Sequence, residues 1–317
     1  MSTSATPPIL LIVFNRLENT KRVFDAIKKA KPQKLYISSD GPREDIKDEK
    51  KLVLRIRKFL LDSIDWECET KTLFHETNQG CKLAPEKAIS WFFENEEKGI
   101  ILEDDCVPSL DFFKYATELL DFYVNDLRVF GISGTNFQTK KYNLEESYYF
   151  SRFFMTWGWA TWRSRWTKHL EILNDFETHL QDANMKFLTS NEVANKRILQ
   201  YAKKGFYDEL DAWDYQWILS CMIHNGLIVT PTTNLVENIG FGPDATHTTS
   251  LSNRQIQTEE FEFPLKHPKI MVPNREIDDS FYKNIFGWLT AQEKLSDLWY
   301  LRTAFLARLK KLVMTNN

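Results

Sequence analysis

Short apolar runs recur along the first part of the chain and predict strands. The runs at 9–14 and 99–102 are apolar throughout, which is typical of strands buried on both faces of a parallel sheet. Strands are also expected at 35–39 and 129–133, and the alternating segment 66–74 predicts a half-exposed strand. This part of the chain therefore contributes at least five strands.

Segments with helical periodicity separate these strands. Apolar residues three or four positions apart predict helices over 19–30, 46–63 and 85–97, and Ser109 is placed to cap a fourth helix. Strands that alternate with helices indicate an α/β fold with a mostly parallel central sheet flanked by helices. In such sheets ligands bind beyond the carboxyl ends of the strands. The polar residues that follow each strand are therefore expected to converge on one crevice.

The rest of the chain is less regular and rich in aromatic residues. Helices are expected near 160–169, 191–204 and 213–225, and a short strand at 227–230. If 160–169 is helical, Trp159, Trp162 and Trp166 could share one face, which ordinarily belongs to the core.

Composition narrows the class of protein. The 317 residues are 43% hydrophobic and 14% aromatic with a formal net charge of −3, so a globular core is expected and a nucleic-acid partner is not. Four widely spaced cysteines without a CxxC pair are typical of reduced intracellular thiols. The sequence has no secretory signal pattern and no apolar run that could span a bilayer, so we expect a cytoplasmic protein.

Three consecutive acids, Glu103, Asp104 and Asp105, follow the apolar run 99–102 directly. Adjacent carboxylates repel one another unless a cation or several hydrogen-bond donors compensate them. A divalent ion with oxygen ligands is the usual solution, and Mn²⁺ or Mg²⁺ held in this way commonly also binds a diphosphate. The alternative is a solvated acidic turn ahead of the next helix.

Polar residues follow the other predicted strands too. Asp40 could accept hydrogen bonds from a ribose or a base, or could serve only the Asp-Gly turn. Asn15 and Arg16 follow the first strand, where Arg16 could pair with phosphate or with Asp40, or could be solvated. Lys82 follows an Asn-Gln-Gly loop that could approach a phosphate or form an ordinary turn.

Four segments that occur in a fixed order along the chain together resemble the nucleotide-sugar domain of GT-A glycosyltransferases. The similarity is closest to the bacterial group related to family-two enzymes and to N-acetylglucosaminyltransferase I, and it covers about residues 7–250. The segments are PILLIVFNRLENTKRVFDAI, SSDG, NQGCKLAPEKAI and ILEDDCVPSLDFF.

This resemblance implies roles for the residues at the strand ends. Asp40 would hold the nucleoside, Asp104 would contact the ribose or donor sugar, and Asp105 would ligate the metal that bridges the diphosphate. Glu103 would support Asp105, in a DxD-like motif. Asn15, Arg16 and Lys82 would border the donor.

The resemblance also implies a GT-A (Rossmann-like) domain over 1–255, with a nucleotide-binding half at 1–135 and an acceptor half at 136–255. The remaining 256–317 form a C-terminal extension.

The second half offers a general base and a further metal ligand. An inverting sugar transfer needs a carboxylate to accept the proton of the attacking hydroxyl. The resemblance implies that this base is an acid that opens a helix late in the domain. Asp214 fits this description, with Asp211 as the substitute, although Asp214 could also simply cap the helix. His247, in a glycine-rich loop, could complete a Mn²⁺ sphere, or could be solvated or donate to diphosphate.

Two further features point to acceptor and location. Most rings between 153 and 166 are expected in the core, with Trp157 or Trp159 against a sugar face. The segment 294–314 predicts a basic amphipathic helix that could lie peripherally on the inner face of the cell membrane. It could instead dock on the domain or on a second subunit of a homodimer.

These patterns predict a metal-dependent glycosyltransferase. It would move a hexose or N-acetylhexosamine from a nucleotide-diphosphate donor, with UDP implied by the resemblance, to a glycan or lipid-linked glycan in surface polysaccharide biosynthesis. One alternative is a sugar-nucleotide nucleotidyltransferase, against which the glycine-free segment 14–18 counts. The other is a non-catalytic glycan-binding or assembly subunit of the same fold.

Overall fold

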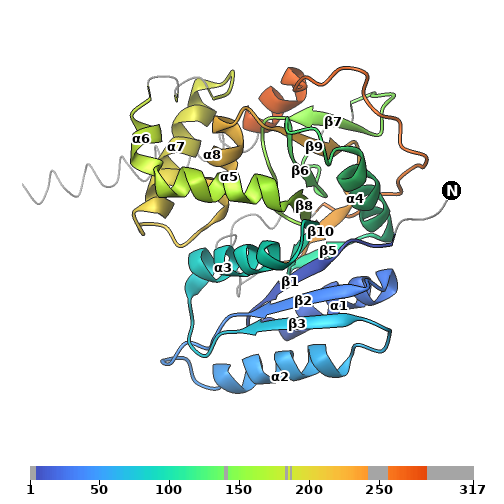
Figure 1. Cartoon of the computed structure of the whole chain (residues 1–317), viewed down its shortest axis with the longest axis vertical. Coiled ribbons are helices and arrows are strands. Elements are labelled where there is room, and N and C mark those ends of the chain that lie inside the picture. The colour runs from blue at the N-terminus through green and yellow to red at the C-terminus, as the bar shows by residue number, and fades with distance from the viewer. Residues whose placement is uncertain (1–4, 139–141, 183–184, 186–187, 242–255, 284–317) are drawn as a thin grey trace, which may run out of the picture.

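An eight-stranded mixed sheet forms the centre of the computed structural model, which describes residues 5–138, 142–182, 185, 188–241 and 256–283 (Figure 1). Pairing is parallel among the first four strands in the sheet and between β6 and β9, whereas β8 and β7 run antiparallel to their neighbours. In sheet order the strands are β3 (Glu69–Phe74), β2 (Lys34–Ser39), β1 (Ile9–Val13), β4 (Lys98–Glu103), β8 (Trp159–Trp162), β6 (Val129–Ser133), β9 (Leu227–Pro231) and β7 (Tyr148–Ser151).

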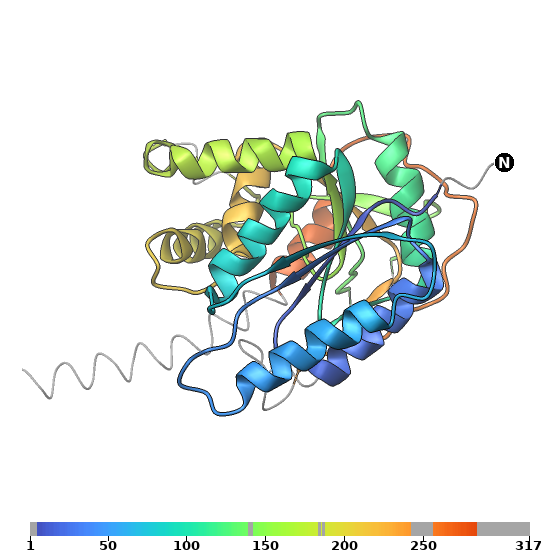
Figure 2. The ribbon, with the colours of Figure 1, turned by 60° about the horizontal axis from the view of Figure 1, so that its bottom comes forward.

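Helices cover both faces of this sheet and divide its core in two. One core packs residues of α1, α2 and α4, and the other packs residues of α3, α5, α7 and α8; Figure 2 shows α1 and α2 on the opposite side of the sheet from α3. The helices are α1 (Leu17–Ala30), α2 (Glu49–Asp62), α3 (Gly80–Asn95), α4 (Leu110–Phe122), α5 (Arg163–Asn174), α6 (Phe176–Leu180), α7 (Glu192–Phe206) and α8 (Asp214–Ile223).

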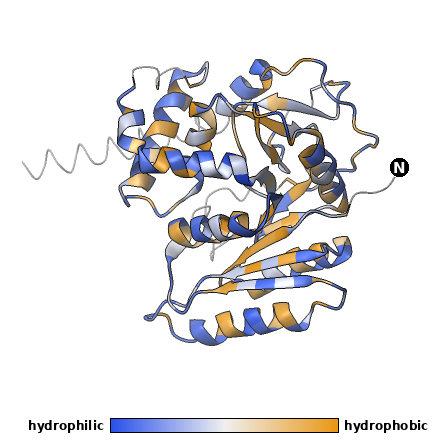
Figure 3. Ribbon diagram, viewed as in Figure 1, coloured by the Kyte–Doolittle hydropathy of each residue, from blue (hydrophilic) through white to orange (hydrophobic). Residues whose placement is uncertain are grey.

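Strand β1 shows why its sequence is apolar throughout. Ile9 and Leu11 pack into one core while Leu10 and Ile12 pack into the other, because successive strand residues face opposite sides. The central strands are accordingly hydrophobic along their length, whereas the edge strand β3 carries hydrophilic positions (Figure 3). The predicted α/β architecture, with a mostly parallel sheet flanked by helices, is confirmed.

The expected helix at 160–169 is partly wrong. Residues Trp159–Trp162 form β8, an antiparallel strand between β4 and β6, and the helix begins only at Arg163. Trp162 packs into one core and Trp159 into the other. The three tryptophans at 159, 162 and 166 therefore do not share one face, because a strand turns alternate residues to opposite sides.

The sequence patterns also missed three short strands and one helix start. Strand β7 and the two-stranded sheet of β5 (Cys106–Pro108) and β10 (Val236–Asn238) were not expected. Helix α3 begins at Gly80 instead of residue 85, because the side chain of a distant acid accepts hydrogen bonds from its first amides, as described below.

The segment 256–283 lies against the sheet edge formed by β7. The Ser147 amide donates to the Lys266 carbonyl at 2.9 Å, and the Asn274 amide donates to the Phe150 carbonyl at 2.8 Å. Within the described residues, no helix is both long and apolar enough to cross a membrane. The amphipathic helix expected at 294–314 lies outside the described residues.

Candidate functional site

The acidic triplet and Arg16 meet at the carboxyl ends of β4 and β1. These strands are parallel neighbours, so the chain leaves both of them at the same edge of the sheet. Arg16 Nη1 lies 2.8 Å from Asp105 Oδ2 and 3.5 Å from Asp104 Oδ1. The Phe14 amide donates to Asp104 Oδ2 at 3.1 Å. The structure therefore joins two of the predicted polar strand ends through an ion pair.

One guanidinium does not compensate the charge of three carboxylates. Burial, followed by the charge of Asp105, raises the pKa of Asp104 to about 7 against the opposing effect of Arg16. Burial and the charges of Asp105, Asp104 and Asp214 raise the pKa of Glu103 well above its ordinary value. The charges at this edge would favour an additional cation.

The proposed base lies near the triplet, although 109 positions separate Asp214 from Asp105 in the sequence. The charge of Asp214 is among the causes that raise the pKa of Glu103, which places the two carboxyls within electrostatic reach. Asp214 is the first residue of α8, where its charge suits the positive end of the helix dipole. The structure thus brings Asp214 near the triplet.

Gly240 contributes to the same place and was not predicted. The Ile239 amide donates to the backbone carbonyl of Asp105 at 2.8 Å, so the chain after β10 runs beside the triplet. A Cβ atom on Gly240 would lie 2.1 Å from Asp105 Oδ2, so only glycine fits against this carboxylate. The sequence signal is the Gly-Phe-Gly run after Ile239, which in the sequence serves only to place His247 in a loop. His247 itself lies outside the described residues.

Asp40 holds the loop after β3 through its buried carboxylate. It accepts hydrogen bonds from the amides of Gly41, Gln79 and Gly80 at 2.7–3.1 Å and from Asn78 Nδ2 at 2.9 Å. Only 7% of the residue is exposed, and burial raises its pKa. The loop predicted to approach the donor is therefore fixed by Asp40, while contact of Asp40 with a nucleoside stays a prediction.

Arg57 supports this arrangement from α2. Its guanidinium donates to the backbone carbonyls of Asp40 at 3.0 Å and His75 at 2.7 Å, which ties the ends of β2 and β3 together. The Arg57 guanidinium also lies 4.8 Å from the centre of the Phe74 ring. Sequence reasoning missed Arg57, because nothing in the helix pattern of 46–63 distinguishes it from a solvated arginine.

Asp211 caps helix α3 from a distant part of the chain. Its two carboxylate oxygens accept from the amides of Cys81 at 2.9 Å and Lys82 at 2.7 Å, and Lys82 Nζ lies 2.5 Å from Asp208 Oδ1. Gly80 adopts φ +84°, a conformation that favours glycine. These contacts account for Asp211 as a helix cap, and they pair Lys82 with a carboxylate of the protein.

Cys81 lies near several of these charged groups. Burial raises the pKa of its thiol to about 11, and the charges of Asp211, Glu103 and Asp40 act in the same direction. The charge of Arg16 opposes them. The charges that act on this thiol therefore come from the carboxyl ends of β1, β2 and β4 and from the segment before α8. Charged residues at these strand ends thus lie within electrostatic reach of one thiol, while their convergence on one crevice stays a prediction.

Asn15 is turned away from the triplet. Its side-chain amide donates to Glu49 Oε1 at 2.8 Å, and Glu49 in turn pairs with Arg43 at 2.5 Å. Glu49 is 4% exposed, so this buried acid at the start of α2 has its own compensation. The arrangement gives Asn15 a structural contact, and its predicted contact with the donor stays a prediction.

The two candidate sugar-contacting tryptophans differ in exposure. Trp159 is fully buried, with its ring centre 5.7 Å from that of Trp217 and 5.8 Å from that of Trp213. The sugar contact predicted for Trp159 is therefore wrong, because neighbouring rings already cover it. Trp157 is partly exposed, and its ring contacts Phe137 and Phe241 at 4.6 and 5.8 Å.

The triplet could hold a divalent cation only together with a ligand that supplies further oxygens. Among the described residues, no group of three or more His, Cys, Asp or Glu side chains is arranged to hold a metal by itself. Mg²⁺ commonly needs only one or two carboxylates, with phosphates and water as the other ligands. Asp105 and Asp104 could supply one or two carboxylate oxygens to such an ion, at an edge where burial and neighbouring carboxylates raise the pKa values of Glu103 and Asp104.

Comparison with known proteins gives only remote structural similarity. No protein-family model and no curated protein matches the chain. The S. aureus TarS 1–349 structure aligns with 71% of this chain and 58% of its own length, at 10% identity and a TM-score of 0.37.

Two further solved structures align at similar levels. A UDP-glucose pyrophosphorylase complexed with UDP-glucose aligns with 52% of this chain and 80% of its own, at 10% identity and a TM-score of 0.31. A putative glucose-1-phosphate thymidylyltransferase from Bacillus anthracis aligns with 62% of this chain and 84% of its own, at 12% identity and a TM-score of 0.30. Similarities this remote assign neither family nor activity, so the functional argument rests on the residues of the site.

Proposed function

We propose that this protein is a metal-dependent glycosyltransferase that takes its sugar from a nucleoside diphosphate donor, with UDP as the nucleotide. The observation that carries the proposal is the excess of carboxylates at the carboxyl end of β4. Asp104 and Glu103 have raised pKa values beside Asp105, and Arg16 is the cation paired with the triplet. A diphosphate could approach these acids only together with a cation, which makes a metal–diphosphate complex the ligand that fits.

Asp105 and Asp104 would hold Mn²⁺ or Mg²⁺ together with the diphosphate. When bound, the metal would stabilise the negative charge that develops on the leaving nucleotide. Arg16 lies 2.8 Å from Asp105 and is placed to orient this carboxylate and to contact an adjacent phosphate. Asp40, through the loop it fixes, would position the nucleoside side of the donor.

Asp214 would act as the general base. The acceptor hydroxyl oxygen attacks the anomeric carbon, the bond from that carbon to the diphosphate oxygen breaks, and the hydroxyl proton passes to Asp214. This single displacement inverts the anomeric centre. The proximity of Asp214 to Glu103 supports the role, and the capping bonds of Asp211 leave Asp214 as our choice between the two acids.

The acceptor would be a glycan or lipid-linked glycan, and Trp157 would offer it a ring. Trp157 is partly exposed, and the backbone of Gly158 with φ +67° follows it directly. Aromatic faces commonly pack against the apolar faces of sugars. We retain surface polysaccharide biosynthesis as the proposed context.

A thermal-shift screen tests this function. The protein is heated with Mn²⁺ and each of UDP, GDP, dTDP, their hexose and N-acetylhexosamine derivatives, and UTP with glucose 1-phosphate. A ligand that binds only the native state raises the melting temperature. We expect the largest rise with a diphospho-sugar and Mn²⁺, followed by release of the nucleoside diphosphate when acceptor glycan is added. Release of pyrophosphate from UTP would instead identify a nucleotidyltransferase, and no metal-dependent shift would contradict the proposal.

A further inference from the structure

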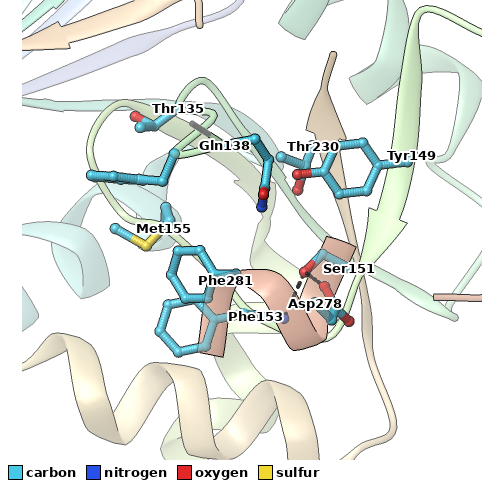
Figure 4. Close-up of a pocket in the computed structure, with 10 residues that line it drawn as sticks. Thr135, Gln138, Tyr149, Ser151, Phe153, Met155, Thr230, Asp278 and Phe281 are labelled. Atoms are coloured by element: carbon cyan, nitrogen blue, oxygen red, sulfur yellow. Dashed lines mark hydrogen bonds between the residues drawn. The ribbon is translucent and has the colours of Figure 1, made fainter. Parts of the chain in front are cut away.

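A small cavity with mixed polar and apolar walls lies near the carboxyl ends of β6 and β9 (Figure 4). It measures about 20 Å³, enough for one water-sized group. Thr135 follows β6, Thr230 belongs to β9 and Tyr149 belongs to β7, while Asp278 and Phe281 close the cavity from the helical segment 275–283. The cavity thus opens at the same edge of the sheet as the acidic triplet, but among different strands.

Two polar atoms of the cavity wall are buried without a partner in the described part of the chain. They are Thr230 Oγ1 and Gln138 Oε1. Thr230 is 5% exposed, and Figure 4 shows the Gln138 amide directed toward Thr230 and Tyr149. A buried polar atom without a hydrogen bond costs free energy, so the pair calls for a bound group. A hydroxyl satisfies both atoms, because it can accept from Thr230 Oγ1 and donate to Gln138 Oε1.

Asp278, the acid in the cavity wall, already accepts hydrogen bonds within the protein. Asp278 accepts from Ser151 Oγ at 2.6 Å and from the Arg152 amide at 3.0 Å. These bonds attach the segment 275–283 to the end of β7. The Asp278 carboxylate therefore positions the wall. The buried atoms of the cavity that lack a partner among the described residues are Thr230 Oγ1 and Gln138 Oε1, and the Gln138 side chain also interacts with the Tyr149 hydroxyl in the same wall.

Aromatic rings connect the cavity with Trp157. The Phe137 ring contacts Trp157 at 4.6 Å and Phe281 at 6.3 Å between ring centres. Thr135 Oγ1, at the cavity, donates to the Trp157 carbonyl at 2.6 Å. A saccharide on the Trp157 ring would thus lie beside the wall of the cavity.

We propose that this cavity is an acceptor subsite that binds the hydroxyl end of one hydroxymethyl group of a saccharide. Its volume excludes a sugar ring, so the ring would lie outside, against Phe137 and Trp157. The inference rests on the proposed function for the identity of the saccharide as an acceptor. A water molecule has the same hydrogen-bonding chemistry, and the test separates the two sources.

Saturation-transfer NMR on the full chain tests the subsite. The probes are the methyl pyranosides of glucose, galactose, mannose and xylose, of which the xyloside lacks the hydroxymethyl group. We expect at least one hexoside to bind more tightly than the xyloside. Thr230→Val keeps the side-chain shape and removes the hydroxyl, and should raise the Kd of that hexoside roughly threefold to tenfold. Thr167→Val, on the exposed surface of α5, is the matched control and should leave the Kd unchanged.

Soaked crystals provide the structural readout. A hexoside oxygen between Thr230 and Gln138 supports the proposal, whereas a water there with the saccharide absent from the cavity overturns it. Equal hexoside binding by wild type and Thr230→Val, or no hexoside binding at all, also overturns it. UDP binding with Mn²⁺ is measured on the same samples and should not change in Thr230→Val. Absence of UDP binding by the wild type would contradict the proposed function separately, without affecting the hexoside result.

Discussion

The acidic edge of Glu103–Asp105 and the tryptophan cluster of Trp159, Trp166, Trp213 and Trp217 each concentrate side chains of one chemical kind, yet they differ in how their members interact. In the cluster the rings fill one another's surroundings, with centres 5.3–6.5 Å apart. At the edge the carboxylates repel one another, and burial together with this repulsion raises the pKa values of Glu103 and Asp104 against the effect of Arg16. Packed neutral rings indicate structure, even though Trp159 Nε1 and Trp217 Nε1 have no hydrogen-bond partner among the described residues. Adjacent carboxylates instead indicate a ligand.

His169, which packs against Trp166 and Trp217 of the cluster, shows the same contrast. His169 donates to or accepts from Ser220 Oγ at 2.8 Å, and burial alone lowers its pKa to about 3. It is therefore neutral and bonded inside the protein. A perturbed pKa thus marks a candidate site only where a group also faces uncompensated charge, as Glu103 does.

The largest expected effect is the loss of sugar transfer in Asp214→Asn. Removal of a general base lowers a rate by about 10²- to 10⁴-fold, while donor binding should not change. Turnover is followed as UDP release with acceptor present. Asp111→Asn, also an acid in the first turn of a helix, is the control and should retain full activity. Full activity of Asp214→Asn would move the base elsewhere.

The structural role of the tryptophan cluster is tested by the free energy of unfolding of two variants. Trp159→Ala should lower the free energy of unfolding by about 3–5 kcal/mol, because it removes a large ring from a packed core. Trp157→Ala, at a partly exposed ring, should cost clearly less. Urea denaturation measures both variants. A loss for Trp159→Ala no greater than for Trp157→Ala would contradict the structural role of the cluster.

A buried carboxyl outside the acidic edge gives the smallest predicted effect. Burial raises the pKa of Asp278 to about 6 against the bonds from Ser151 and Arg152. The folded state therefore binds this proton more tightly than the unfolded state, so stability is present at low pH and is lost as pH rises through the folded pKa. Between pH 5 and 7 the wild type should lose about 1 kcal/mol relative to Asp278→Asn.

Chemical denaturation at each pH measures this difference, and comparison with the variant cancels the titration of the other groups. An unchanged gap between wild type and Asp278→Asn, or a gap that changes in the opposite direction, would show that Asp278 has an ordinary pKa.

The sheet and the acidic edge could be predicted from local pattern, while other parts of the site could not. Apolar runs that end in polar residues identify buried parallel strands, and the triplet at the end of 99–102 needs no tertiary information. Strand β8 was missed because Trp159–Trp162 becomes a strand only between β4 and β6. Asp211 as the cap of α3 and Gly240 beside Asp105 depend on contacts between residues more than 100 positions apart.

Calorimetry of UDP with and without Mn²⁺ tests the central claim, that Asp105 takes part in a metal-dependent diphosphate site. Wild type and Asp105→Asn are compared, with Asp65→Asn as a control, since Asp65 also pairs with a basic side chain, at 2.7 Å from Lys28 Nζ. We predict Mn²⁺-dependent binding by wild type and the control, and an affinity at least about tenfold lower in Asp105→Asn. UDP binding that needs no metal and is equal in all three proteins would contradict the account.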